Sequence, residues 1–401
     1  MKVLYTGKFV SDNATGATAA AFFSVVKNWG PSKKDQLDQA IPKLLEANPI
    51  LTSHLESRKG ESGVEVVAVF NTYGAKDLLR YIERPSSAVP STPIEDMKPN
   101  ELLAHVESHA IPHFPAHVSV STRLGTEEIR ERTPVFEVHV MDLSSNHACI
   151  AVVMSHVVGD GAVYFQVMEQ LNAAMKGPIE TKINWDGYDK LPEVLSHIIP
   201  HPVTLLGYML GVRAFKQTHG KSAPDSEILL LSKDKVNKKK KELVDANTKF
   251  LSGNDVVVAA LSEAMIDHAT LQMQYANLRV RVDNLESNDA GNFIPTDIID
   301  ARLASGNPNV VRKVSSKGKS NISPWRTFMP LASGKFNRNT NLTKVSVGQF
   351  DDCVAYLPSA ALATKKPFYF TAVFEYDSET LGVMTNCPMK QAPLLQSILL
   401  D

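Results

Sequence analysis

A histidine and an aspartate lie four positions apart, as His156 and Asp160, in the stretch AVVMSHVVGDGAVYFQVMEQL. An imidazole with a pKa near 6.5 can accept a proton from a hydroxyl or an amine at neutral pH, which is the task of a general base. The simpler alternative is a histidine that is held by local backbone contacts and does no chemistry. The motif taken alone leaves these two interpretations about equally supported.

The patterns on either side of the motif predict where this histidine lies. The preceding segments VFEVHVMDL and ACIAVVMSH are typical of two strands joined by a turn at SSNH, and the second is apolar on both faces, as a central strand is. Four apolar residues then repeat at helical spacing: Val163, Val167, Leu171 and Ala174. Residues 156–161 should therefore form a tight strand-to-helix connection, in which Gly159 and Gly161 supply backbone freedom for the bend.

Other segments of the first half also have clear patterns. A helix is expected over TAAAFFSVVKNWG, and a second over SKKDQLDQAIPKLLEANPIL, with Ser32 as its N-cap and Asn48-Pro49 as its stop. The apolar stripe of this second helix consists of Leu37, Ile41, Leu44 and Leu45. The segment GVEVVAVFN is expected to be a strand, and the Pro- and Ser-rich RPSSAVPSTPIEDMKPNE to be a surface loop.

The second half has a similar order of elements, without a residue-level repeat of the first. After a connecting segment that contains the mildly helical LLGYMLGVRAFKQ, we expect a strand at EILLLS, helices at KDKVNKKKKELVDAN and SGNDVVVAALSEAMIDHA, and a strand at ANLRVRVDN. Three or four further strands and a closing helix, QAPLLQSILL, should follow. Ser252 and Asp255 have the spacing of a capping box.

Length and composition limit the possible functions. With 401 residues the chain exceeds one usual hydrophobic core, so two domains are expected. Its 42 basic and 43 acidic residues give a formal net charge of −1, so nothing electrostatic suggests nucleic acid or an anionic membrane as a partner. The three cysteines have no zinc-binding spacing: Cys149, Cys353 and Cys387. We therefore expect reduced thiols in a cytoplasmic protein, no metal site, and a small-molecule partner.

The sequence also predicts a chain without stable membrane insertion. Its start, MKVLYTGKFV, lacks a continuous apolar core, and no later segment reaches the length needed to span a bilayer. The apolar content of 43% is that of a globular protein.

Four stretches together resemble the CoA-dependent acyltransferase superfamily, which includes the BAHD and fungal alcohol acyltransferases, wax ester synthases and peptide-synthetase condensation domains. SHVVGDG is similar to the family's His-x-x-x-Asp-Gly signature. LLEANPILTSHL, FLSGNDVVVAALSEAM and NLRVRVDNLESNDAGNFI resemble, in the family's order, an N-terminal helix end, a central helix, and a strand followed by a Gly-Asn loop. The resemblance covers most of the chain.

This resemblance implies an α/β fold of two chloramphenicol acetyltransferase-like domains, each a mixed β-sheet layered with helices, with a channel between them. The expected parts are an N-terminal domain at 1–185 that carries the motif, a linker at 186–225 and a C-terminal domain at 226–401. Because two similar halves would complete such a site within one chain, we expect a monomer.

The resemblance also implies an activity. The protein would move an acyl group from acyl-CoA, used as a co-substrate, to a hydroxyl, in preference to an amine, of a small molecule, with no bound cofactor. His156 would be the general base. Asp160 and Gly161 would support its loop, with Asp160 turned away from the substrate and paired with Arg279. Arg281 lies two residues further, on the same face of the predicted strand.

Other roles implied by the resemblance are less specific. Lys249 and Ser252 lie where relatives often meet the pantetheine and phosphates of CoA, although a surface lysine and a capping serine explain them equally well. The candidates for binding the tetrahedral oxyanion are Thr340, Asn341 and Ser346.

The chain departs from its relatives in ways that leave alternatives open. It has SVGQFDD where plant BAHD enzymes have Asp-Phe-Gly-Trp-Gly, and Ser155 where condensation domains have the first of two adjacent histidines. A stand-alone enzyme that uses soluble acyl-CoA is favoured. A condensation-type enzyme with a carrier-protein-bound donor and a catalytically silent binding member are the alternatives. Asn292 of the Gly-Asn pair could do no more than close a turn.

Overall fold

The computed structural model contains two compact units, each assembled from separate stretches of chain. The first consists of Met1–Pro192, Asp283–Asn292 and Val345–Leu362. The second consists of Glu193–Val282, Phe293–Lys344 and Ala363–Asp401. The continuous boundaries expected near residues 185 and 225 stay a prediction. The residues that the structure describes are 1–6, 20–60, 63–84, 92–119, 125–180, 182–198, 201–219, 226–246, 248, 250–275, 277–280, 282–292, 296–317, 323–342, 350–358 and 368–401.

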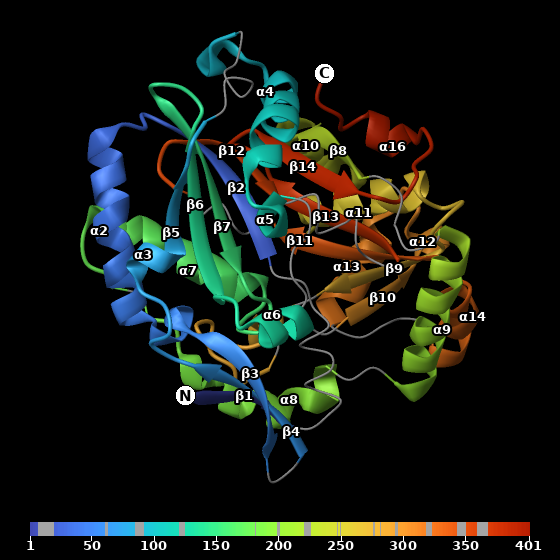
Figure 1. Ribbon diagram of the computed structural model, residues 1–401. Coiled ribbons are helices and arrows are strands. Elements are labelled where there is room, and N and C mark those ends of the chain that lie inside the picture. The colour runs from blue at the N-terminus through green and yellow to red at the C-terminus, as the bar shows by residue number, and fades with distance from the viewer. Residues whose placement is uncertain are drawn as a thin grey trace. The chain divides into compact units, whose positions relative to one another are not determined.

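A five-stranded mixed sheet forms the centre of the first unit (Figure 1). Its strands, in spatial order, are β12 (Cys353–Pro358), β2 (Ala20–Lys27), β7 (His147–Met154), β6 (Phe136–Asp142) and β5 (Leu79–Ile82). Neighbouring strands are antiparallel except β5 and β6, which are parallel. All of β7 is buried, as the apolar pattern predicts for a central strand, and its predicted pairing with β6 is confirmed.

Strand β2 contradicts one prediction, because a helix is expected over residues 18–30. Residues 20–27 instead pair with β7 along their whole length, from Ala20 opposite Met154 to Lys27 opposite His147. The run AAFFSVV is apolar at almost every position, so its periodicity cannot separate a buried helix from a buried strand. Pairing with a strand on each side decides the conformation here.

Two helices of the first unit pack together beside this sheet, α2 (Pro31–Ala47) and α7 (Gly161–Lys176). The Tyr164 hydroxyl of α7 donates a hydrogen bond of 3.1 Å to the Val152 carbonyl of β7. Helix α7 therefore packs against the strand that precedes it, and the predicted order of strand, tight connection and helix is confirmed.

The second predicted helix is confirmed as α2, with a difference at its start. Its apolar stripe is buried, and it ends at Ala47, directly before the predicted stop at Asn48-Pro49. The N-cap is Gly30 and not Ser32, and no side chain caps the helix. Proline at the first helical position explains the earlier start, because its fixed φ suits a first turn and its missing N–H is not needed there.

A chain of short helices crosses the other face of the five-stranded sheet (Figure 1). Phe23 of β2 lies opposite Ala151, and Ala151 lies opposite His139, so these side chains share one face. The Phe23 ring meets the Phe114 ring edge-on, with centroids 5.2 Å apart. Along the chain, Phe114 is preceded by η3 (Ile94–Asp96), α4 (Pro99–His105), the π-helix η4 (Val106–Ala110) and η5 (Ile111–His113), and is followed by α5 (Ala116–Ser119).

A smaller antiparallel sheet completes the first unit. Its strands, in spatial order, are β1 (Lys2–Thr6), β4 (Gly63–Val69) and β3 (His54–Gly60), and β4 confirms the strand predicted at GVEVVAVFN. The remaining elements are η1 (Pro49–Thr52), α3 (Ala75–Leu78), α6 (Gly125–Glu131) and η6 (Trp185–Lys190), after which α8 (Leu191–Ile198) begins.

A six-stranded mixed sheet forms the second unit. Its strands, in spatial order, are β10 (Thr296–Asp300), β9 (Leu271–Tyr275), β11 (Phe336–Leu342), β13 (Tyr369–Glu375), β14 (Thr380–Thr385) and β8 (Glu227–Ser232). The helices are α9 (Pro202–His219), α10 (Lys233–Leu243), α11 (Gly253–Ala264), α12 (Ala301–Ala304), α13 (Pro308–Lys317), α14 (Pro324–Ala332) and α16 (Pro393–Gln396). Val256 and Val257 of α11 share a buried core with Val373 and Val383. Among the helices in the described ranges, none combines the length and apolar character needed to cross a membrane.

The strand predicted at ANLRVRVDN is wrong in its described part. Strand β9 already ends at Tyr275, and Leu278–Val280 form the 3-10 helix η7. The Asn277 Oδ1 atom accepts hydrogen bonds from Arg279 N at 3.0 Å and Arg279 Nη1 at 3.3 Å. An asparagine that bonds the backbone two residues ahead offers the chain a turn in place of a strand. Apolar alternation does not reveal this local competition.

Candidate active site after strand β7

The loop that carries His156 begins where β7 leaves the sheet. Ser155 N continues the strand pairing, with a hydrogen bond of 2.8 Å to Val135 O. The Ser155 hydroxyl donates to the Glu128 carboxylate of α6 and accepts from Val157 N at 3.2 Å. Ser155 therefore fixes the end of the strand and the turn that follows, and His156 lies between these two attachments in a partly buried position.

Asp160, which is 1% exposed, is the N-cap of α7. Its Oδ1 atom accepts from Ala162 N at 3.1 Å and Val163 N at 3.3 Å, and its carbonyl accepts from Tyr164 N at 3.0 Å. These bonds satisfy amide groups that the first turn of a helix leaves unpaired, and they fix the exit of the loop. Arg279 belongs to the second unit, and its predicted pairing with Asp160 stays a prediction.

Gly159 and Gly161 were predicted to supply backbone freedom for the bend, and the structure shows a different reason for glycine at position 159. Neither Gly159 nor Gly161 has a positive φ, and the glycines that do, in the part of the chain that is described, lie outside this loop. A Cβ atom at Gly159 would lie 2.6 Å from the Cβ atom of Val163. The loop therefore needs glycine at position 159 because α7 approaches it closely, and not for a left-handed backbone.

A distant stretch of the first unit braces this loop. The Asn292 side-chain amide donates to the His156 carbonyl at 2.8 Å, and Asp160 N donates to the Gly291 carbonyl at 3.4 Å. Gly291 has a φ of 144°, a conformation that favours glycine. The Gly-Asn pair, which could have closed a turn and nothing more, thus holds the backbone of the motif loop from outside. Its only signal in the sequence was the family resemblance.

Asp289 anchors this bracing stretch within the first unit. Its buried carboxylate accepts hydrogen bonds from Lys190 Nζ at 2.8 Å, Asn184 Nδ2 at 2.7 Å and Glu286 N at 2.7 Å. Burial, the largest single influence, acts to raise the pKa of Asp289, but the bonds from Lys190, Glu286 N and Asn184 together lower that pKa below its ordinary value. The carboxylate is therefore charged at neutral pH and fixes the stretch that carries Asn292.

Three other predicted site residues lie in the second unit: Ser252, Thr340 and Asn341. The Ser252 hydroxyl accepts from Asp255 N at 3.3 Å, and Ser252 N donates to the Asp255 carboxylate at 2.6 Å, so the predicted capping box at the start of α11 is confirmed. Thr340 and Asn341 are successive residues of β11, so their side chains point to opposite faces of the sheet. Three predicted residues fall outside the described ranges: Lys249, Arg281 and Ser346.

The buried cysteines are poorly suited to act as nucleophiles. Burial raises the pKa of the Cys149 thiol on β7, and it also raises that of Cys387. The reactive form of cysteine is the thiolate, which a raised pKa disfavours. Cys353 is partly buried, and its thiol donates to the Ala355 carbonyl at 3.2 Å.

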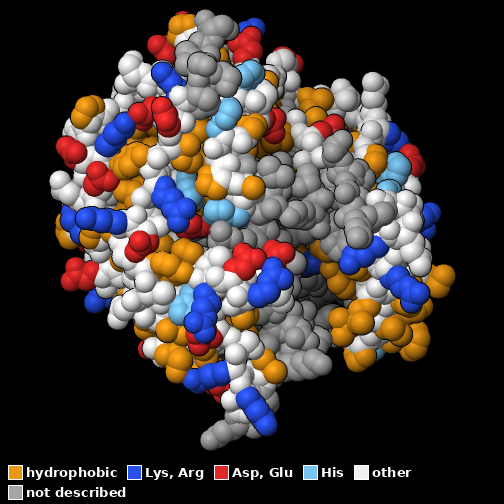
Figure 2. All heavy atoms as spheres, viewed as in Figure 1, with side chains coloured by type: hydrophobic (Ala, Val, Ile, Leu, Met, Phe, Trp, Pro, Cys, Tyr) orange, Lys and Arg blue, Asp and Glu red, His pale blue; other side chains and the backbone are white. Residues whose placement is uncertain are grey.

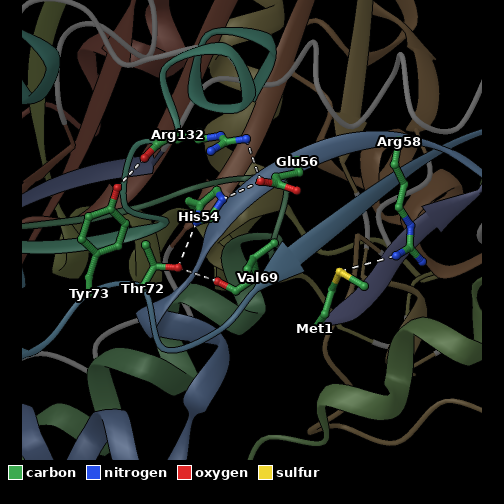
Figure 3. A network of polar contacts seen from close by, with 8 residues as sticks. All are labelled: Met1, His54, Glu56, Arg58, Val69, Thr72, Tyr73 and Arg132. Atoms are coloured by element: carbon green, nitrogen blue, oxygen red, sulfur yellow. Dashed lines mark hydrogen bonds and ion pairs between the residues drawn. The ribbon is translucent and has the colours of Figure 1, made fainter.

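A polar network borders a surface pocket of about 410 Å³ in the first unit (Figure 3). His54 bonds Thr72 Oγ1 at 2.9 Å through Nδ1 and Glu56 Oε1 at 3.0 Å through Nε2. Arg132 Nη2 lies 3.1 Å from Glu56 Oε1, and Tyr73 donates to the Arg132 carbonyl. The hydrogen bond from His54 lowers the pKa of Glu56. The pocket has mixed charge, with Lys76, Asp77, Arg80, Glu131 and Arg132 in its lining.

Comparisons with known proteins bear on the fold. No family model and no curated protein matches the sequence. Among solved structures, F. graminearum TRI101 complexed with coenzyme A and T-2 mycotoxin has a TM-score of 0.65 at 11% identity, over 96% of this chain and 94% of that one. Vinorine synthase has a TM-score of 0.60 at 14% identity, over 99% and 92%. The condensation domain of the Monacolin K polyketide synthase MokA has 0.57 at 9%, over 97% and 90%.

This chain shares the fold of these neighbours. Each of its units layers a mixed sheet with helices, as in the two-domain chloramphenicol acetyltransferase-like architecture. The α/β fold expected from the four sequence stretches is therefore confirmed.

Proposed function

We propose that the protein is an acyltransferase that moves an acyl group from acyl-CoA to a hydroxyl, in preference to an amine, of a small molecule. The observation that carries the proposal is the position of His156, directly after the central strand β7 of a CoA-dependent acyltransferase fold. One structural neighbour was crystallised with coenzyme A and T-2 mycotoxin, a thiol cofactor together with a small molecule. That pairing supports the same kinds of substrate for this chain.

In the proposed reaction the neutral imidazole of His156 takes the proton of the acceptor hydroxyl while the hydroxyl oxygen attacks the thioester carbonyl carbon. The tetrahedral oxyanion then collapses, the carbon–sulfur bond breaks, and the CoA thiolate takes up the proton from the imidazolium. Because a thiol is much more acidic than an alcohol, its departure needs little assistance and one base is enough. No acyl-enzyme is required, and holding both substrates together supplies much of the rate.

The loop geometry supports a base of fixed position. Before His156, Ser155 N is bonded to Val135 O at 2.8 Å, and after it Asp160 caps α7. The His156 carbonyl itself accepts from Asn292 at 2.8 Å. Because proton transfer depends steeply on geometry, attachments on both sides of the histidine favour efficient catalysis.

The further parts of the proposal rest on the likeness to relatives of this fold. The residues that would support the loop are Asp160, Gly161 and Arg279. The candidates for CoA contacts are Lys249 and Ser252. The candidates for the oxyanion are Thr340, Asn341 and Ser346, of which Thr340 and Asn341 cannot both face one site from β11. The enzyme would act as a cytoplasmic monomer, without a bound cofactor, with domains near 1–185 and 226–401 around a channel.

A second candidate is a condensation-type enzyme whose acyl donor is bound to a carrier protein. The fold match to the MokA condensation domain favours it, whereas the single histidine of Ser155-His156 favours the CoA-dependent enzyme. A binding protein without catalysis is the third possibility, and the intact set of His156, Asp160, Gly161 and Arg279 argues against it.

A thiol-release assay separates these candidates. The purified protein is incubated with acyl-CoAs of increasing chain length and with hydroxyl or amine acceptors, and free thiol and acylated product are measured. We expect thiol release that requires the acceptor. Thiol release without an acceptor, or none with any pair, would count against the proposal, and transfer only from an acylated carrier protein would support the second candidate.

A further inference from the structure

Three side chains that can bind metal ions lie together in the first unit: His117 of α5, and Glu137 and His139 of β6. Glu137 and His139 are two positions apart on one strand, so both point to the sheet face that the short helices cross. Their ligand atoms and that of His117 all lie within 4.8 Å of one another. No metal site was expected from the sequence, because the cysteines lack zinc-binding spacing. His117 and Glu137 are 20 positions apart and meet only in the folded chain.

The distances suit a transition-metal ion. His117 Nε2 lies 2.9 Å from Glu137 Oε2, and His139 Nε2 lies 3.9 Å from Glu137 Oε1. The two imidazole rings are 5.9 Å apart and inclined by 70°, so both can direct a nitrogen toward one point. Zinc bonds to these atoms are about 2.0–2.2 Å long, which places neighbouring ligands of a tetrahedral ion roughly 3.3 Å apart. Side-chain shifts on the order of 1 Å would therefore complete the coordination.

Burial and charge also favour a cation at this position. The side chains of Glu137 and His139 are 3% and 0% exposed. A buried carboxylate is costly unless positive charge compensates it, and a divalent ion provides that charge. His117 is 18% exposed, which gives an ion a route of entry. Arg80 Nη2 lies 3.7 Å from Glu137 Oε1, but its side chain is half exposed and can turn to solvent when an ion binds.

We propose that His117, Glu137 and His139 bind one divalent transition-metal ion, with zinc as the preferred ion, through two imidazole Nε2 atoms and a carboxylate oxygen. Imidazole and carboxylate ligands suit zinc, and a fourth position is left for water. The ion ties α5 to β6 and so fixes the short helices on the sheet. This site does not depend on the proposed acyl transfer.

Calorimetric titration of the EDTA-treated, dialysed full-length protein with zinc chloride tests the proposal. We expect one tight site per chain. His117→Ala and Glu137→Gln should each weaken it about 100-fold or more, since each removes a ligand. Cobalt should occupy the same site and give the visible absorption bands of a four- or five-coordinate ion. These absorption bands should be lost in His117→Ala and in Glu137→Gln.

Exposed histidines of the same helical segment provide the matched controls. Figure 2 shows several histidine side chains on the surface of this face. His109 and His113 are both exposed. His109→Ala and His113→Ala should leave the affinity and the cobalt spectrum unchanged. Circular dichroism checks that each variant folds. If one ligand variant does not fold, the other decides. A protein without a tight zinc site, or a site that survives loss of the ligands, would overturn the proposal.

Discussion

Asn292 holds the backbone of the proposed base, His156, because the Asn292 side-chain amide donates to the His156 carbonyl at 2.8 Å. Asn292→Ala removes this bond and lets the loop shift. We expect kcat to fall about tenfold while KM for acyl-CoA stays within about twofold, since a displaced base slows proton transfer without a lost contact to CoA. Steady-state kinetics gives both constants.

The matched control for this variant lies in the same stretch of chain. The Asn288 side-chain amide donates to the Lys182 carbonyl at 3.0 Å and makes no such bond to the motif loop. Asn288→Ala should keep kcat within about twofold of the wild type, as surface substitutions usually do. Equal losses of kcat in the two variants would show general loosening of the stretch and would contradict a specific brace on His156.

Asp160 has one role seen in its hydrogen bonds and a second that we propose. Because Asp160 is the N-cap of α7, Asp160→Ala should lower the free energy of unfolding by about 1 kcal/mol. If its carboxylate also neutralises Arg279, the loss should rise to roughly 3–5 kcal/mol, because a buried charge is left without compensation. Urea unfolding of Asp160→Ala measures the difference.

Two further variants separate these roles of Asp160. Asp160→Ser keeps a capping oxygen and removes the charge, so it should remain clearly destabilising if Arg279 is the partner. Asp160→Ala combined with Arg279→Ala should cost less than the sum of the single losses. Strict additivity, together with a nearly neutral Asp160→Ser, would mean that Asp160 acts as a cap alone.

Among elements, the stretch at 283–292 depends on Asp289, whose pKa is lowered by its hydrogen bonds. The unfolded chain, with an aspartate pKa of about 3.9, then binds more protons than the folded one. This contribution to stability is present above about pH 4 and is lost as the pH falls through the lower folded pKa. Asp289→Asn should cost about 2–3 kcal/mol at neutral pH and should lose less stability on acidification than the wild type.

Urea unfolding at a series of pH values between about 3 and 7 measures this dependence across the ordinary aspartate pKa. The exposed Asp283, at the start of the same stretch, is the matched control. Asp283→Asn should follow the wild-type pH dependence. The same dependence in Asp289→Asn as in the wild type would show that Asp289 does not provide acid-sensitive stability.

The sequence could predict elements whose pattern is unambiguous, and it failed where local chemistry or pairing decides. The strand-to-helix order of β7 and α7 followed from burial and a 3.6-residue repeat. In contrast, the apolar residues of β2 would suit a buried helix as well as a buried strand. Its pairing with β12 and β7 makes this segment a strand. Arg279 lies in the 3-10 helix η7 and not in a strand because Asn277 bonds its backbone.

At the scale of the whole molecule, the unpredicted features join residues far apart in the chain. Strand β12, which begins at Cys353, pairs with β2 near the start of the chain. Asn292 bonds His156, which is 136 positions away in the sequence. A sequence motif can identify a candidate catalytic residue, because the reactivity of a side chain is known from its residue type. The residues that brace it, or that meet it as His117 meets Glu137, become neighbours through tertiary contacts that periodicity does not encode.

The proposed function of the whole protein rests on His156, so the most direct measurement compares acceptor-dependent CoA thiol release by the wild type and by His156→Ala. General-base assistance predicts a fall in kcat of about two to four orders of magnitude. The temperature of unfolding should change little, and the exposed-histidine variant His113→Ala should keep wild-type turnover. Near wild-type turnover by folded His156→Ala would contradict the proposed role of His156 as the base.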